Sequence, residues 1–79
     1  MTTFTRTDKK TKAVTELTLK EAVDQFILDN LDYAQPEEGI TPEEALEDMV
    51  SVFETRAELN DLEDGDELDA GYFIYAKKN

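Results

Sequence analysis

The clearest periodic pattern in the chain lies within residues 19–31, where apolar residues fall at positions 19, 22, 23, 26, 27 and 31. Spacings of three and four residues place these side chains along one face of a helix. Thr18, followed three residues later by Glu21, has the pattern of a capping box, which predicts where the helix begins. The breakers in the following AQPEEG segment predict its end near Asp32 or Tyr33.

A second helix is predicted from Thr41 onward. Thr41 and Glu44 form another capping-box pattern, and Pro42 suits the first helical position, where a missing N–H costs nothing. The apolar stripe expected to face the core consists of Leu46, Met49, Val50, Phe53 and Ala57. The stripe expected to face solvent consists of Glu43, Glu47, Glu54 and Glu58.

β-Branched and aromatic residues predict three strands. Residues 2–7 and 13–17 flank the polar stretch DKKT and predict a hairpin, with Phe4 and Val14 as its inward side chains. Residues 70–77 (AGYFIYAK) predict a third strand, preceded by a loop over residues 60–69. Because this strand is apolar on both faces, it is expected either to lie in the centre of the sheet or to meet a partner.

Together these elements predict one α+β domain covering residues 1–79, with the order β-β-α-α-β. We expect a three-stranded antiparallel sheet with two helices packed on one face. The order of the elements would pair the C-terminal strand with the N-terminal hairpin.

Charge is distributed unevenly along the chain. Twenty acidic residues face eight basic ones, for a net charge of -12. Residues 21–76 hold eighteen of the acids and one base, Arg56. Such a chain is repelled by nucleic acid and anionic lipid and attracted to basic protein surfaces. Acidity also keeps proteins soluble, so solubility alone is the competing explanation for these charges.

The composition offers little for catalysis. Histidine and cysteine are both absent, which removes the commonest general base and any thiolate zinc site. We therefore expect no enzymatic activity, no cofactor and no dedicated metal site. In the acidic loop, placing Gly65 at the sixth position of a calcium loop puts Leu62 at the third, where a ligand is required. One hypothesis for function is nevertheless that clustered carboxylates bind a metal ion weakly. Thermal stabilisation of the protein by calcium would reveal such binding.

The cellular location expected for the protein depends on targeting and membrane-spanning segments. The first residues lack the apolar core of a signal peptide, and no apolar run approaches the ~20 residues of a membrane span. We expect a cytoplasmic protein with no membrane partner. Lys9, Lys10 and Lys12 are too few, within so negative a chain, to predict direct nucleic-acid binding.

In size, charge and lack of catalytic residues, the whole chain resembles small acidic inhibitor proteins of phages and mobile elements. These include anti-CRISPR and anti-restriction proteins that act as DNA mimics. The opening MTTFT is also similar to the openings of some anti-CRISPR proteins. The resemblance rests on no motif, so it assigns no functional residue. It implies action in a phage-infected or lysogenic bacterial host, on a basic nucleic-acid-binding protein or complex such as a CRISPR effector.

The leading hypothesis is that carboxylates take the place of DNA phosphates in a partner's groove and block its binding of target DNA. The predicted contact residues are Glu43, Glu47, Asp48, Glu54, Glu58, Asp61, Glu63, Asp64, Asp66 and Glu67. The alternative is an adaptor or regulatory module that binds through the C-terminal strand, with Tyr72 or Tyr75 as its anchor, or through a helix face, and in which the acids serve solubility. The salt dependence of partner affinity distinguishes the two hypotheses, because only the mimic should lose affinity steeply as ionic strength rises. Either protein would be a monomer or a homodimer.

Overall fold

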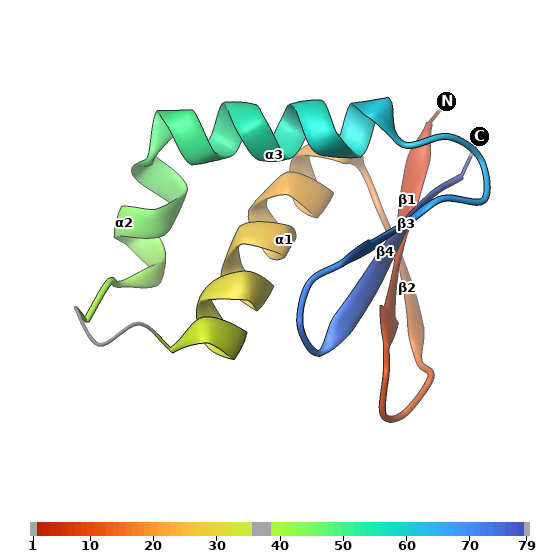
Figure 1. Cartoon of the computed structure of the whole chain (residues 1–79), viewed down its shortest axis with the longest axis horizontal. Coiled ribbons are helices and arrows are strands. Elements are labelled where there is room, and N and C mark those ends of the chain that lie inside the picture. The colour runs from red at the N-terminus through yellow and green to blue at the C-terminus, as the bar shows by residue number, and fades with distance from the viewer. Residues whose placement is uncertain (1, 36–38, 79) are drawn as a thin grey trace.

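The computed structural model describes residues 2–35 and 39–78. Four strands form one antiparallel sheet in the order β2-β1-β4-β3, and the helices gather on one side of it (Figure 1). The molecule extends 36 × 28 × 15 Å. The elements are β1 (Thr3–Asp8), β2 (Val14–Leu17), α1 (Leu19–Ala34), α2 (Pro42–Glu47), α3 (Met49–Asp61), β3 (Glu67–Asp69) and β4 (Phe73–Lys78).

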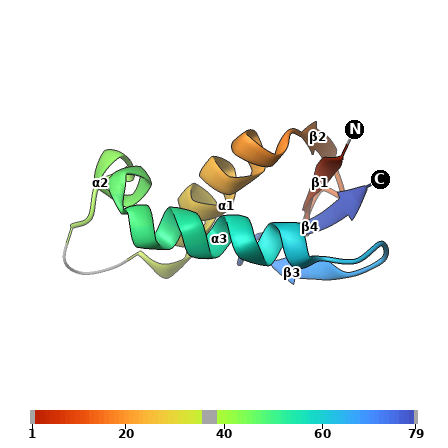
Figure 2. The ribbon, with the colours of Figure 1, turned by 90° about the horizontal axis from the view of Figure 1, so that it is seen from above.

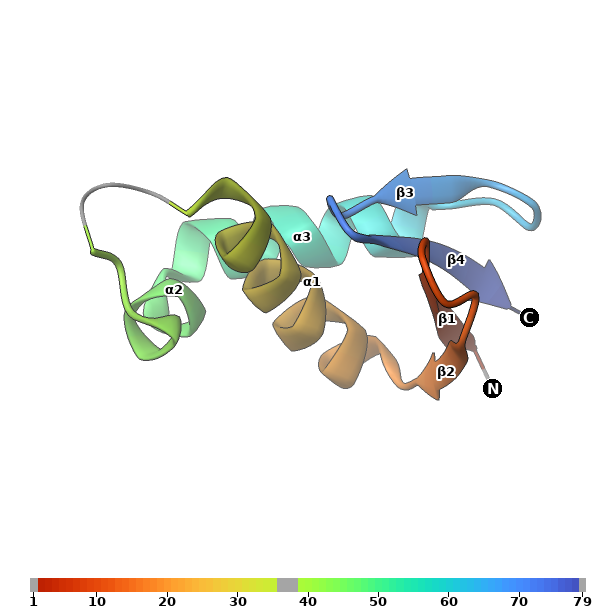
Figure 3. The ribbon, with the colours of Figure 1, turned by 90° about the horizontal axis from the view of Figure 1, so that it is seen from below.

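The first helix confirms its periodic pattern. Thr18 and Glu21 form the complete reciprocal capping box at its start. The helix ends at Ala34, slightly later than predicted, because the next residue, Gln35, takes a left-handed conformation with φ 44°. Its apolar face is buried at Ala22, Val23, Phe26 and Ile27. α1 contacts β1 and β2 as well as α3, which crosses over it when seen from above and lies behind it when seen from below (Figures 2 and 3).

The N-terminal hairpin is also confirmed, although one of its two inward residues is wrong. Phe4 is fully buried and lies directly opposite Leu17 on β2. Side chains alternate along a strand, so Val14, an odd number of positions from Leu17, points to the other face. It is 62% exposed there, opposite Thr7.

The predicted three-stranded sheet is wrong, because the sheet has a fourth strand. Residues 67–69, expected in the acidic loop, form β3 and pair with β4. Leu68, the apolar residue of this short strand, lies opposite the buried Tyr75 and packs against the core. As a result β4 lies between β1 and β3, which confirms the expectation of a central C-terminal strand.

The predicted pair of helices is wrong as well, because the second one is broken at Asp48 into α2 and α3. Asp48 has an extended backbone, and its carboxylate accepts hydrogen bonds from the backbone N–H groups of Val50 and Ser51. An aspartate that caps a new helix in this way competes with continuation of the preceding one. At the start of α2, the Thr41 hydroxyl accepts from the Glu44 N–H, which is the first half of the predicted box.

The break changes which face of the second helical region is buried. α3 packs through Thr55 and Leu59, which are 8% and 0% exposed. The residues expected to face the core instead face solvent: Met49 is 59% exposed, Val50 65% and Phe53 61%, and Ala57 is exposed too. The predicted stripe therefore holds only at Leu46 on α2, which is partly buried against the core. The new cap at Asp48 sets the rotation of α3 independently of α2.

Candidate functional site

Residues 43–67, called the acidic segment below, contain the ten predicted carboxylate contacts. The segment holds eleven acidic residues and one base, Arg56. It begins on α2 at one end of the molecule, follows α3, and reaches the loop before β3 at the opposite end (Figure 1). All ten predicted residues are exposed. The backbone that carries them therefore runs along most of the length of the molecule.

None of these ten carboxylates forms an ion pair with any residue that the structure describes. The ion pairs found within residues 2–35 and 39–78 use other acids and are Arg6–Asp29, Lys9–Asp69, Lys20–Asp24 and Lys78–Glu16. Lys77 reaches α3, but its Nζ donates to the carbonyl oxygen of Asn60 at 2.8 Å. A cation at the end of a helix interacts favourably with the helix dipole. The bases of the chain thus leave the acidic segment largely uncompensated.

The break at Asp48 divides the glutamates that the sequence placed in one stripe. Glu43 and Glu47 belong to α2, whereas Glu54 and Glu58 belong to α3. The expected continuous stripe of four is therefore wrong. On α3, Asp61 follows Glu54 and Glu58 at helical spacing, so these three carboxylates share one face.

Two of the ten predicted contacts also support the local fold. Asp48 accepts from the Ser51 hydroxyl at 2.9 Å and from two backbone N–H groups. The Ser51 hydrogen bonds, followed by that from Val50, lower the pKa of Asp48 below its ordinary value. Asp66 accepts from the backbone N–H of Glu63 at 3.2 Å and holds the turn before β3. The other eight carboxylates accept no hydrogen bond from the described part of the chain.

The two predicted tyrosine contacts have different environments. Tyr75 is 0% exposed and belongs to the core, so it is not accessible to a partner. Tyr72 is 51% exposed and packs edge-on against Tyr33, with ring centroids 5.0 Å apart. Gly71 permits this contact, because its φ is +81° and a Cβ there would overlap the Tyr33 ring. Tyr33 is itself 57% exposed, and the sequence pattern did not single it out as a partner of Tyr72.

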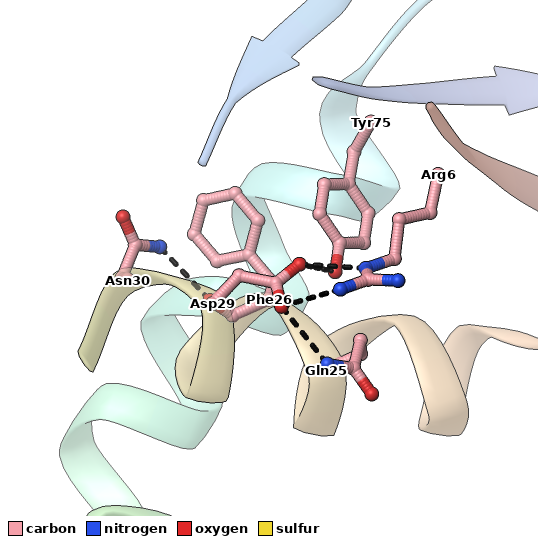
Figure 4. Close-up of polar contacts among 6 residues, drawn as sticks. All are labelled: Arg6, Gln25, Phe26, Asp29, Asn30 and Tyr75. Carbon is pink, nitrogen blue, oxygen red and sulfur yellow. Dashed lines mark hydrogen bonds and ion pairs between the residues drawn. The ribbon is translucent and has the colours of Figure 1, made fainter. Parts of the chain in front are cut away.

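One polar network, centred on Asp29, is largely buried between α1 and the sheet (Figure 4). Asp29, on α1, is 5% exposed and accepts two hydrogen bonds from Arg6 on β1, at 2.7 and 2.8 Å. Its carboxylate also accepts from the Tyr75 hydroxyl at 2.6 Å and from Gln25 at 2.9 Å. The Arg6 guanidinium lies 3.4 Å from the centroid of the Phe73 ring. The network joins both central strands to α1.

The pKa values in this network favour one fixed charge state. Burial opposes the charge on Asp29, but hydrogen bonds from Arg6, Tyr75 and Gln25 outweigh it and lower the pKa of this carboxyl. Burial, followed by the hydrogen bond to Asp29, raises the pKa of the Tyr75 phenol. The hydrogen bond to Asp29 raises the pKa of Arg6. Although a depression of about 590 Å³ adjoins the network, four donors already occupy the Asp29 carboxylate. The network therefore has a structural role, because it holds α1 against β1 and β4.

The outer face of α3, defined as Met49, Val50, Phe53 and Ala57, is a feature that sequence reasoning assigned to the core. Three large apolar side chains are more than half exposed there within five residues. The signal that could have identified it is the pair Asp48 and Ser51, which has the spacing of a helix cap inside an apparently continuous helix.

The described residues offer neither a metal site nor a membrane span. Within residues 2–35 and 39–78, no three carboxylates converge in a way that could hold a metal ion. None of the helices described has both the length and the apolar character needed to cross a membrane.

Comparison with known proteins gives no independent assignment. No protein-family model matches the chain, and no match was found among curated proteins or solved structures. The surface features that distinguish the molecule are the acidic segment and the outer face of α3.

Proposed function

We propose that this protein acts by binding rather than by catalysis, as a small acidic inhibitor of a basic nucleic-acid-binding protein. The observation that carries the proposal is the state of the acidic segment. Its ten predicted carboxylates are exposed and have no ion-pair partner in the described chain, although the protein has eight bases. A surface with this charge attracts lysine and arginine side chains.

The spacing of the charges supports competition with DNA. Eleven acids and one base give the acidic segment a net charge of -10, spread along most of a molecule 36 Å long. This is roughly one net charge per 3.6 Å or slightly less, and one strand of duplex DNA carries a phosphate every ~3.4 Å. A groove lined to bind one phosphate strand would therefore meet a comparable line of carboxylates.

The finer proposal is that the partner is a CRISPR effector complex in the cytoplasm of a bacterial host. Its support is the resemblance in size and charge to anti-CRISPR proteins, together with the positively charged channels of such effectors. The alternative, an adaptor that binds through the C-terminal strand or a helix face, loses one of its two predicted strand anchors because Tyr75 is buried, and Tyr72 is the one left.

The experiment is affinity capture from a bacterial lysate, with elution by a salt gradient and identification by mass spectrometry. We expect recovery of a nucleic-acid-binding protein that elutes as salt rises and that duplex DNA displaces. Recovery of partners that resist salt and ignore DNA would contradict the proposal.

A matched pair of variants tests the position of the contact. Glu54→Gln with Glu58→Gln neutralises two exposed carboxylates of the acidic segment, and Glu16→Gln with Asp32→Asn neutralises two exposed carboxylates outside it, of which Glu16 pairs with Lys78 at 3.4 Å. Both variants change the net charge equally. We expect the first to weaken capture about tenfold, and the second to have little effect, because short-range ion pairs add to the general field. Equal effects would assign the binding to net charge alone.

A further inference from the structure

The outer face of α3 differs from ordinary surface because its apolar residues are contiguous. Met49, Val50 and Phe53 are 59%, 65% and 61% exposed, and they lie within a little more than one helical turn. Single exposed apolar residues are common on proteins, whereas clusters of them mark interaction sites. DNA mimicry gives no reason for such a cluster, because phosphates have no apolar counterpart.

The shape of this face suits a second helix. Met49, Phe53 and Ala57 follow one another at four-residue intervals, so they form a ridge along α3 roughly 12 Å long. Ridges of this spacing fit the groove between side chains of a crossing helix. Within the described part of the chain, the neighbours of α3 are mainly α1 and α2, and no element crosses its upper side (Figures 1 and 2).

Charge selects among the helices that could bind there. Glu54, Glu58 and Asp61 lie on α3 beside the apolar ridge. A second copy of this chain would bring another net charge of -12 and the same carboxylates against them. A helix with lysine or arginine flanking an apolar stripe would bury its apolar side and pair its cations with these acids.

We propose that the outer face of α3 is the docking site for a basic amphipathic helix of the partner protein. The cationic character of this partner is taken from the proposed function, on which the inference rests. The inference adds that the partner is also held by an apolar contact. Salt screens the ion pairs but leaves apolar burial intact. The complex should therefore retain part of its affinity at salt concentrations that abolish phosphate-like binding.

The test uses two synthetic probes of equal charge. One is an amphipathic helical peptide of leucine and lysine, about 18 residues long, and the other is oligolysine. Affinities are measured by fluorescence anisotropy at about 50 and 300 mM NaCl, and contacts are mapped by amide chemical shifts. We expect the amphipathic peptide to bind at least about tenfold more tightly, since only it can bury apolar surface. The shifts should concentrate on residues 49–61.

A matched control comes from two valines with nearly equal exposure. Val50, on the outer face of α3, is 65% exposed, and Val14, on β2, is 62% exposed. We expect Val50→Ala to weaken binding of the amphipathic peptide about threefold and Phe53→Ala about tenfold, because both remove buried contact. Val14→Ala should leave it unchanged. Circular dichroism of each variant checks that the fold is retained.

Three results would overturn the inference while leaving the proposed function intact. These are equal affinity for the two probes, equal effects of Val50→Ala and Val14→Ala, and sedimentation of the free protein as a dimer that Phe53→Ala dissociates. The last would assign the face to a second copy. Failure of the proposed function has a different signature, because the partner captured from the lysate would then resist salt and would not be displaced by duplex DNA, whatever the affinities of the two probes.

Discussion

The sheet-and-α1 region and the acidic segment differ in how they use charged side chains. In the first, the Asp29 carboxylate is buried and accepts hydrogen bonds from Arg6, Tyr75 and Gln25. In the second, Glu54 and Glu58 are exposed and have no ion-pair partner among the described residues. The contrast separates two environments: the Asp29 charge is paired inside the fold, whereas the Glu54 and Glu58 charges are accessible to another molecule.

A similar contrast exists between the two sides of α3. Leu59 is fully buried against the core, whereas Phe53 is 61% exposed on the outer face. One helix therefore carries an apolar side that stabilises the fold and another whose burial requires a partner. Unfolding free energies of matched variants distinguish the two sides.

The largest expected effect is on the buried side of α3. Leu59→Ala should lower the free energy of unfolding by about 3 kcal/mol, because it removes contacts and leaves a cavity. Phe53→Ala should change it by no more than about 0.5 kcal/mol, as is usual for surface substitutions. Urea denaturation measures both. A larger loss for Phe53→Ala would mean that the outer face packs against the core.

The next effect concerns the buried network. Asp29→Asn should destabilise the protein by about 2–3 kcal/mol, because it leaves Arg6 without its counter-charge in a mostly buried position. The control is Asp24→Asn, which removes an exposed pair with Lys20 and should cost less than about 0.5 kcal/mol. Similar losses in the two variants would show that Asp29 has no special structural role.

The same network predicts a pH dependence. The pKa of Asp29 is lowered in the folded protein, so its contribution is fully present above the ordinary aspartate pKa of ~3.9. It is lost as pH falls through the folded value. The difference in stability between the wild type and Asp29→Asn should therefore be constant from about pH 7 to 5 and shrink toward pH 2. A difference that grew on acidification would have the wrong sign.

A smaller loss of stability is expected from substitutions at two glycines with positive φ, Gly71 and Gly65. Gly71→Ala should cost about 1–2 kcal/mol or more, because the backbone is left-handed and the new Cβ would overlap Tyr33. Gly65, in the acidic segment, has open space around it, so Gly65→Ala should cost only the backbone strain of about 1 kcal/mol. Thermal melts of the two variants give the comparison. Equal costs would argue against the packing of Tyr33 on Gly71.

The smallest effect is expected on the acidic segment itself. Glu54→Gln with Glu58→Gln should leave stability unchanged or raise it by a few tenths of a kcal/mol, because like charges four residues apart on a helix repel. The gain should disappear as salt rises. A clear loss of stability would show that these carboxylates have internal partners and do not serve binding alone.

The elements with strong local signals could be predicted from sequence. The capping box at Thr18 and the apolar spacing that follows it identified α1, and alternating β-branched residues identified the hairpin. The apolar run in β4 indicated a central strand. Each of these signals depends on neighbours in the sequence, so no knowledge of the tertiary packing was needed.

The errors arose where long-range packing decides the outcome. Leu68 is the one apolar residue of β3, so the local sequence gives little indication of a strand there. The strand forms by pairing with β4, where Leu68 lies opposite Tyr75. The rotation of α3 depends on the cap at Asp48 and on contact with α1, which the apolar pattern does not specify. The exposure of the acidic residues was predictable from their chemistry. The pairing of Arg6 with Asp29, twenty-three residues apart, was not.

The most direct test of the central claim is a competition between this protein and duplex DNA for the captured partner. We predict that DNA and the protein exclude each other. We also predict that raising salt weakens the complex, and that the loss with salt is less steep for the Glu54→Gln, Glu58→Gln variant because it has fewer ion pairs to screen. A ternary complex of partner, DNA and this protein, with an affinity independent of salt, would contradict the claim that the acidic segment takes the place of phosphates.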